Sequence, residues 1–259
     1  MVHDPDQRNQ RSDMAGAGKP SDEETIDSYY RGNPKLGAKD LRHQRDVLAS
    51  RNPDTPSWVL GELIKTGNAD VLAGLAANAA CPRHLLDAVL EQCEKWGPGP
   101  RSSYVNRRLA ANPLAPGDIL DRLLRSGDED TRLAAAANLG APEGALRVAA
   151  QHDQSPEVRA VATANLNTPP PSESIRKEPD PRVRVAAACR RDVSPGLLDL
   201  LAADGDPLVR RAVAANLNTT TKTLLNLSAD PESESVRATA TENPNHHKAG
   251  PAATGLLKD

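Results

Sequence analysis

The chain has 259 residues and carries 32 Lys and Arg against 35 Asp and Glu, a formal net charge of −3. This balance excludes a protein that binds nucleic acid or anionic membranes through an overall positive charge. Aromatic residues make up only 2% and Phe is absent, so the core must be built from Ala, Leu and Val instead of large rings.

Three cysteines are too few for a disulfide framework. No apolar run reaches the ~20 residues of a bilayer span, and the first residues lack the apolar segment of a secretory signal. We therefore expect a soluble protein of the cytoplasm.

Residues 1–40 are polar, rich in Gly and Asp and without hydrophobic periodicity, which predicts a largely disordered tail. The segment 26–31 is the exception, because Tyr29 and Tyr30 would cap the exposed end of the first structural repeat. A repeat array is predicted from residue 41 to residue 245. Residues 246–259 again lack a helical period and are predicted to be disordered.

A short motif recurs about every 26 residues along the array. It reads SPEVRAVATANLNTP from Ser155, DPRVRVAAACRRDVSP from Asp180 and DPLVRRAVAANLNTT from Asp206. One position of the motif is Asn in seven of eight copies, while the remaining copy has Arg190. These residues are Asn52, Asn78, Asn112, Asn138, Asn165, Asn216 and Asn243.

Each copy is expected to contain a first helix that begins at a polar cap and ends at this Asn. The candidate caps are of residue types whose side chains accept hydrogen bonds from the free amides of a first helical turn. They are Asn68, Ser102, Asp128, Ser155, Asp180, Asp206 and Ser233. We call the seven recurring Asn residues the Asn column. Because Asn tolerates a left-handed φ and its amide can bond the turn of the next repeat, we interpret this column as stabilising the array and not as binding a ligand.

A second, shorter helix is expected to begin four residues past the Asn. In most copies Pro stands at its first position behind a small or hydroxyl-bearing residue, as in Thr55-Pro56. Apolar residues then recur three, four, seven and eight positions after the Pro, the single stripe of an amphipathic helix. One such helix pair cannot bury its apolar faces alone, so the pattern predicts an all-α solenoid of about eight two-helix repeats.

The stretches VRRAVAANLNTTTKTLLNLSAD from Val209 and RLAAAANLGAPEGALRVAAQHD from Arg132 resemble the leucine-rich repeat variant, a relative of the HEAT repeats. The resemblance covers about residues 41–243. It implies a right-handed superhelix in which each repeat pairs an α-helix with a shorter, sometimes 3₁₀, helix. Some members carry an N-terminal cysteine cluster for an iron–sulfur centre, but the first eighty residues here contain no cysteine, so this cluster is not carried over.

Two irregularities interrupt the array. Between the second and third copies about eight residues are added, and the Gly-Pro-Gly-Pro run there predicts a protruding loop over about residues 92–103. In TPPPSESIRKEPD, from Thr168, the second helix loses its apolar stripe to polar residues. This break is interpreted either as a weak repeat that kinks the array or as a hinge or polar docking point.

Five successive copies have Arg at one equivalent position of the motif, and we call these residues the Arg column. They are Arg132, Arg159, Arg184, Arg210 and Arg237. One interpretation is a structural ladder in which each Arg pairs with cap or turn acids such as Asp128, Asp180 and Asp206. The other is a stripe that tracks phosphates.

The favoured function is a non-enzymatic scaffold that binds a protein or peptide as a monomer, without cofactor, metal or membrane. The candidate partner-binding residues are Trp58, Trp96, Arg83, Arg122 and Arg125, because Trp is enriched in binding hot spots and these Arg residues belong to the second helices. Trp58 has an alternative role in packing on the two tyrosines. The alternative function is a nucleic-acid-binding, HEAT-like DNA glycosylase, which the acidic, aromatic-poor composition disfavours. A small-molecule enzyme is the third hypothesis.

Overall fold

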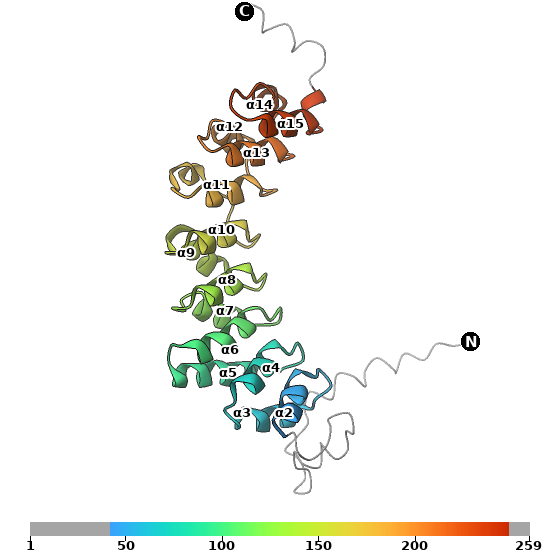
Figure 1. Ribbon diagram of the computed structural model, residues 1–259, viewed down its shortest axis with the longest axis vertical. Coiled ribbons are helices and arrows are strands. Elements are labelled where there is room, and N and C mark those ends of the chain that lie inside the picture. The colour runs from blue at the N-terminus through green and yellow to red at the C-terminus, as the bar shows by residue number, and fades with distance from the viewer. Residues whose placement is uncertain (1–41, 249–259) are drawn as a thin grey trace, which may run out of the picture. The chain divides into compact units, whose positions relative to one another are not determined.

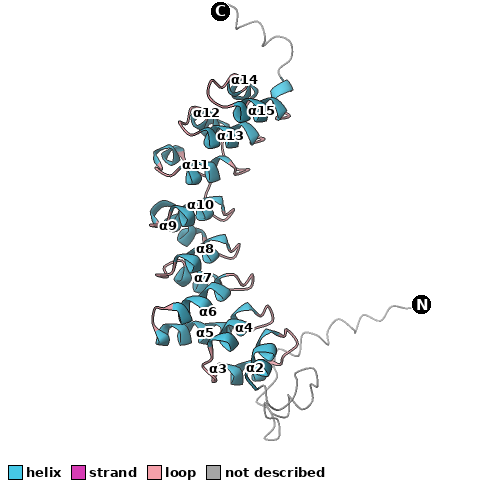
Figure 2. Ribbon diagram, in the orientation of Figure 1, coloured by secondary structure: helices cyan, strands magenta, loops and turns pink. Residues whose placement is uncertain are grey.

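The computed structural model describes residues 42–248. These residues fall in two compact units that divide between Ile119 and Leu120. Every regular element in this part of the chain is helical and none is a strand (Figure 2), which confirms the prediction of an all-α protein. The predicted tail at 1–40, its cap at 26–31 and residues 249–259 lie outside the described residues. Residues 246–248, predicted to be disordered, instead form a 3₁₀ turn, η5 (His246–Lys248).

The first unit alternates first and second helices along the chain (Figure 1). Helices α2, α4 and α6 pack on one another in that order, and α3 packs on α5. Their close approach depends on small residues: a Cβ on Gly74 would lie 2.9 Å from the Cβ of Ser50 and closer still to its hydroxyl. The helices are α2 (Arg42–Arg51), α3 (Ser57–Ile64), α4 (Ala69–Ala77), α5 (Arg83–Trp96), α6 (Pro100–Ala110) and α7 (Gly117–Leu123), the last of which crosses the division.

The second unit repeats the same plan. Helices α8, α10, α11, α13 and α15 pack in sequence, and the second elements lie beside them (Figure 1). Helix α9, with 10 residues, is longer than these first helices, which have 8 or 9, although the sequence predicts shorter second helices. The core between them is Leu, Val and Ala, as the composition requires. The elements are α8 (Glu129–Ala137), α9 (Glu143–His152), α10 (Pro156–Ala164), η4 (Glu173–Lys177), α11 (Pro181–Ala188), α12 (Pro195–Leu201), α13 (Pro207–Ala215), α14 (Thr221–Leu227) and α15 (Glu234–Glu242).

The predicted caps of the first helices are confirmed in all copies but one. Six of the seven residues are N-caps whose side chain accepts a backbone N–H of the first turn. Ser102 is the exception, because α6 begins two residues earlier, at Pro100. Its buried hydroxyl instead donates to the carbonyls of Gly97 and Gly99, at 2.7 and 3.0 Å.

Helix α12 begins as predicted, with Ser194 as its N-cap and Pro195 at its first position, but several other second helices begin differently from the prediction. In α3, α5 and α9 the Pro is itself the N-cap and makes no side-chain cap bond, so it precedes the first helical position. The hydroxyl of the residue expected to cap is used elsewhere. Thr55 donates to the carbonyl of Ala49 at 2.7 Å and Thr219 to that of Val213 at 2.5 Å, and Thr168 does the same with Ala162. Each of these hydroxyls ties the turn to the end of the first helix.

The prediction of a protruding loop over residues 92–103 is wrong, because helices α5 and α6 cover most of this range. Helix α5 continues to Trp96 because Cys93, only 1% exposed, extends its buried stripe by one more turn. Helix α6 then begins at Pro100. Only Gly97 to Gly99 lie between the helices, and Gly97 takes a positive φ of 73° that favours glycine. The additional residues therefore lengthen two helices instead of forming a protruding loop.

Candidate functional site

The recurring Asn side chains make one set of hydrogen bonds in copy after copy. Asn216 donates its two amide hydrogens to the carbonyls of Ala188 and Arg190, at 2.6 and 2.8 Å, both in the preceding copy. Its side-chain oxygen accepts the N–H of Asn218 at 2.8 Å. Asn78, Asn112, Asn165 and Asn243 repeat this pattern. In Asn52 and Asn138 the oxygen accepts the N–H two residues on.

Two details of the expected Asn geometry are corrected. No residue other than Gly has a positive φ within residues 42–248, and Asn216 is extended at φ −73° and ψ 132°. The amide bonds the preceding copy and not the next one. An extended backbone places the amide across the end of the neighbouring first helix, where free carbonyls need donors. The short side chain with two donors and one acceptor suits this position.

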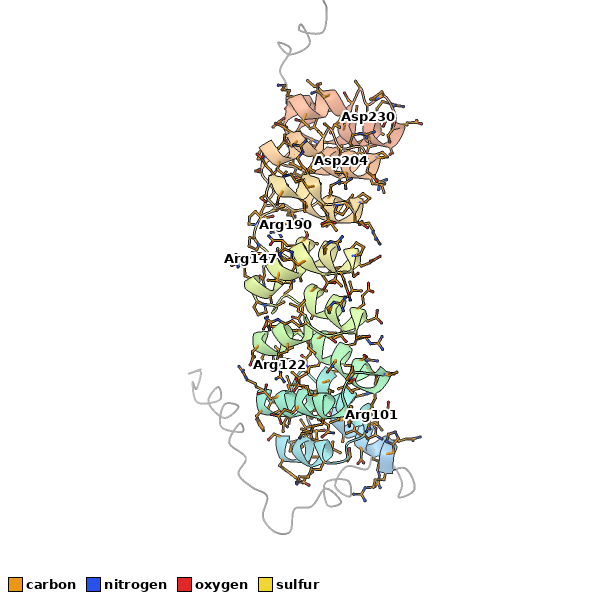
Figure 3. All side chains as sticks on the ribbon, turned by 90° about the vertical axis from the view of Figure 1, so that its left-hand side faces the viewer. Arg101, Arg122, Arg147, Arg190, Asp204 and Asp230 are labelled. Carbon is orange, nitrogen blue, oxygen red and sulfur yellow. The ribbon has the colours of Figure 1, made fainter. Side chains whose placement is uncertain are left out.

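The Arg column forms clamps between successive turns. Arg132, Arg184 and Arg210 each hold a carboxylate through Nε and Nη2, with Nε to oxygen distances of 2.7–2.8 Å. Their partners are Asp153, Asp204 and Asp230, which lie in the turn before the next first helix. Figure 3 labels Asp204 and Asp230. Arg159 reaches Glu178 through Nη2 alone, at 2.8 Å. The third nitrogen, Nη1, donates to a carbonyl in the turn before the Arg's own helix, and Arg237 makes this last bond as well.

The acids named from the sequence are therefore not the main partners. Asp128, Asp180 and Asp206 use their carboxylates to cap their own helices. The four clamped Arg side chains are only 6–14% exposed. Hydrogen bonds from Arg210 hold the pKa of Asp230 below its usual value, although burial opposes this shift. These guanidinium groups are committed to carboxylates inside the array, which disfavours the phosphate-stripe interpretation.

The break in the row of second helices has a local cause. The three residues Pro169 to Pro171 supply no backbone N–H groups, so an α-helix cannot form through them. Only the five-residue 3₁₀ turn η4 follows. Ile175 is the one apolar residue of η4, and it packs, half-buried, against the core of the second unit. The other side chains of η4 are polar and exposed.

Arg190 stabilises the chain at this break. It occupies the Asn position, is 4% exposed, and donates to the carbonyls of Thr163 and Asn165 at 2.8 and 2.9 Å. Its longer side chain also reaches the carbonyl of Thr168 at 2.7 Å, at the start of the proline run. Asp192 accepts from Nε and Nη2 and neutralises the charge. The Arg thus replaces the Asn bonds and adds one that fixes the irregular turn, a role the sequence analysis missed.

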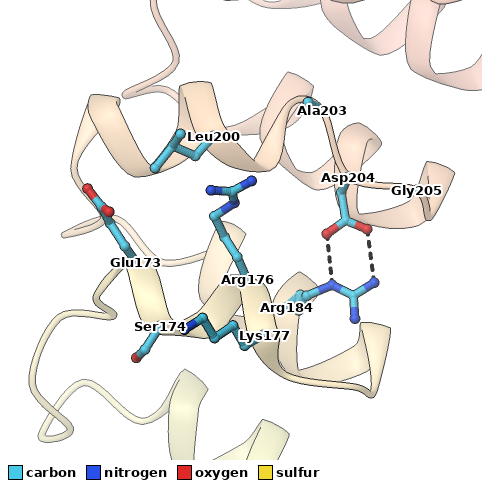
Figure 4. Close-up of a pocket in the computed structure, with 9 residues that line it drawn as sticks. All are labelled: Glu173, Ser174, Arg176, Lys177, Arg184, Leu200, Ala203, Asp204 and Gly205. Carbon is cyan, nitrogen blue, oxygen red and sulfur yellow. Dashed lines mark hydrogen bonds and ion pairs between the residues drawn. The ribbon is translucent and has the colours of Figure 1, made fainter.

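A cleft of about 660 Å³ opens between η4 and α12. Arg176 extends from η4 across it toward α12 (Figure 4). Leu200 of α12 lies on the far wall, and Lys177 and Glu173 line the η4 side. The Arg184–Asp204 pair closes one end, with two hydrogen bonds of 2.8 and 2.9 Å. The cleft exists because η4 replaces a full apolar helix with side chains that do not fill the space.

The five residues proposed for partner binding are divided between the two units, Trp58, Arg83 and Trp96 in the first and Arg122 and Arg125 in the second. The ring of Trp96 is half-buried beneath Arg101, whose guanidinium lies 3.8 Å from the ring centroid. Trp58 is also half-buried and has an interaction within the chain. The three Arg side chains all have partners: Arg83 pairs with Asp118 at 2.6 Å, Arg125 pairs with Asp121 at 2.8 Å, and Arg122 is likewise engaged.

The thiols differ in exposure. Cys81 and Cys93 are buried, and burial raises the pKa of each to about 12. Cys189, which the repeat pattern predicts to be buried, is exposed at the C-cap of α11. Within residues 42–248 no three His, Cys, Asp or Glu side chains are placed together as a metal site requires. No helix in the same part of the chain has the length and apolar character needed to cross a bilayer.

Comparison of the chain with protein-family models, with curated proteins and with solved structures finds no match. Membership of the leucine-rich repeat variant family therefore stays a prediction from the motifs.

Proposed function

We propose that this chain is a right-handed α-solenoid of about eight two-helix repeats of ~26 residues, and that it acts as a non-enzymatic scaffold binding a protein or peptide. In this proposal the protein is a cytoplasmic monomer and needs no cofactor. The cleft between η4 and α12 is the central part of its binding surface.

One observation carries the proposal: the polar residues that recur in the motif are engaged between copies, whereas the two cations of η4, Arg176 and Lys177, are not. The Asn and Arg columns hold neighbouring turns through buried hydrogen bonds. Arg176 and Lys177 line an open cleft and have no such partner within residues 42–248. A regular array that stabilises itself through one set of residues leaves the irregular position available for recognition.

The alternative of a nucleic-acid-binding protein is less well supported. Such proteins line a groove with free cations and with aromatic side chains on which bases stack. Here the clamped arginines are occupied, and the residues lining the cleft include no aromatic side chain.

The proposal is tested with a photo-crosslinking amino acid placed in the native cell. Benzoylphenylalanine replaces Ala203, which is exposed in the cleft, or Glu234, which is exposed at the start of α15. We expect one recurring protein partner cross-linked from position 203 and not from position 234, identified by mass spectrometry. Cross-linking to nucleic acid, or no protein adduct at position 203 above that of the control, contradicts the proposal.

A further inference from the structure

Three cations around the break lack a partner in the described chain. Arg176 and Lys177 are on η4, and Arg147 is on α9, the second helix of the preceding copy. All three are exposed, and none has an ion pair or hydrogen bond to its side chain within residues 42–248. They lie on both sides of η4, because Arg147 lines a small hollow of about 110 Å³ on its α9 side while the other two line the cleft on its α12 side.

Two cations on second helices elsewhere in the described chain are paired. Lys65 pairs with Glu62 at 2.6 Å, and Arg83 with Asp118 at the same distance. At the break, the carboxylate of Asp204 is already held by Arg184. Glu173 is the remaining carboxylate among the residues lining the cleft. The surface around η4 therefore has a positive excess in a protein whose formal net charge is −3.

Apolar surface lies directly beside these cations. Leu200 is half-buried on the wall of the cleft, and Pro170 and Ile175 line the hollow on the other side. Exposed cations next to apolar walls suit a chain in which carboxylates alternate with aliphatic side chains, because the charges steer the ligand and the apolar contacts hold it. Three cations without a stacking aromatic among the lining residues suit a nucleic acid poorly.

We propose that the η4 surface, formed by Arg147, Arg176, Lys177 and Leu200, binds an acidic peptide segment with aliphatic residues between its carboxylates. This inference rests on the proposed scaffold function and names the chemistry of the partner. Arg176 and Lys177 take the carboxylates in the cleft. Arg147 takes a further carboxylate across η4, and Leu200 contacts an aliphatic side chain.

The test is fluorescence anisotropy with the full chain. The probe is a fluorescein-labelled nine-residue peptide of three Glu-Glu-Leu repeats, and its counterpart has three Lys-Lys-Leu repeats. The site variant is Arg176→Ser with Lys177→Ser. The matched control is Arg191→Ser with Lys222→Ser, which removes two other exposed cations of the second unit and changes the net charge equally. Thermal melting verifies that both variants remain folded.

We expect the acidic probe to bind and the lysine probe not to bind. The site variant should weaken binding about ten-fold, the value for two exposed ion pairs of ~0.7 kcal/mol each. The control should change it less than about two-fold, and higher salt should weaken binding to the unmodified chain. Leu200→Ser should weaken binding without changing its dependence on salt.

Three outcomes overturn the inference: no binding of the acidic probe, equal loss in both variants, or tighter binding of a fluorescein-labelled oligonucleotide that the site variant also abolishes. The first two leave the scaffold proposal standing if position 203 still cross-links one protein in the cell. Loss of that cross-link as well removes both proposals.

Discussion

Replacement of Asn216 by Ala tests whether the Asn column holds neighbouring copies together. The substitution removes three hydrogen bonds, two to the carbonyls of Ala188 and Arg190 and one from the N–H of Asn218. Asn216 is 8% exposed, so water replaces these partners poorly. At about 1 kcal/mol for each net hydrogen bond, the free energy of unfolding should fall by roughly 3 kcal/mol.

The matched control lies in the same turn. Asn218 also donates its amide to two carbonyls of the preceding copy, at 2.6 and 3.1 Å, but its side chain is exposed. Asn218→Ala should therefore lower the free energy of unfolding by less than about 1 kcal/mol. Urea unfolding followed by circular dichroism at neutral pH gives both values. If Asn216→Ala lowers the free energy of unfolding by no more than Asn218→Ala does, the buried amide of Asn216 does not stabilise the array.

Three further predictions concern packing, charge and thiol exposure. Gly74→Ala should lower the free energy of unfolding by about 1–3 kcal/mol, because the new methyl group overlaps Ser50; urea unfolding should show partial recovery when Ser50→Gly is added, and no recovery would contradict the steric cause. Asp230 has a lowered folded-state pKa, so its bond to Arg210 stabilises the protein above pH ~4 and is lost as the pH falls through the folded-state value. The stability difference between the unmodified chain and Asp230→Asn should accordingly shrink between about pH 5 and pH 2 in thermal melts, and a constant difference would refute the linkage. Burial raises the pKa of all three thiols, but only Cys189 is exposed, so Ellman's reagent should modify Cys189 in the folded protein and the other two thiols only after unfolding; rapid reaction of all three would show that the buried turns open readily.

The sequence by itself determined the local structure of this protein. Caps such as Asp206 and the apolar stripes of the second helices act within one or two helical turns, so their spacing predicts where helices start and which face is buried. The loss of an apolar stripe after Thr168 was visible in the sequence, but the replacement of the second helix by η4 was not predicted, although Pro169 to Pro171 lack the N–H groups that an α-helix needs. Where the predicted start of a helix differs from the observed one, the difference is small. Pro82, for example, is the N-cap of α5 and not its first helical residue.

Only the tertiary structure decided which polar groups meet. The sequence indicates Asp206, four residues before Arg210, as a partner, whereas in the structure Arg210 bonds Asp230, 20 residues away, and Glu232. The choice depends on the direction in which each turn leaves its helix, which fixes Asp206 as a cap and frees Asp230 for the clamp. The cleft beside η4 arises in the same way, because its volume is set by how α12 packs past a turn with a single apolar side chain. Side-chain reach across neighbouring turns is a property of the packed array, and no single stretch of sequence contains it.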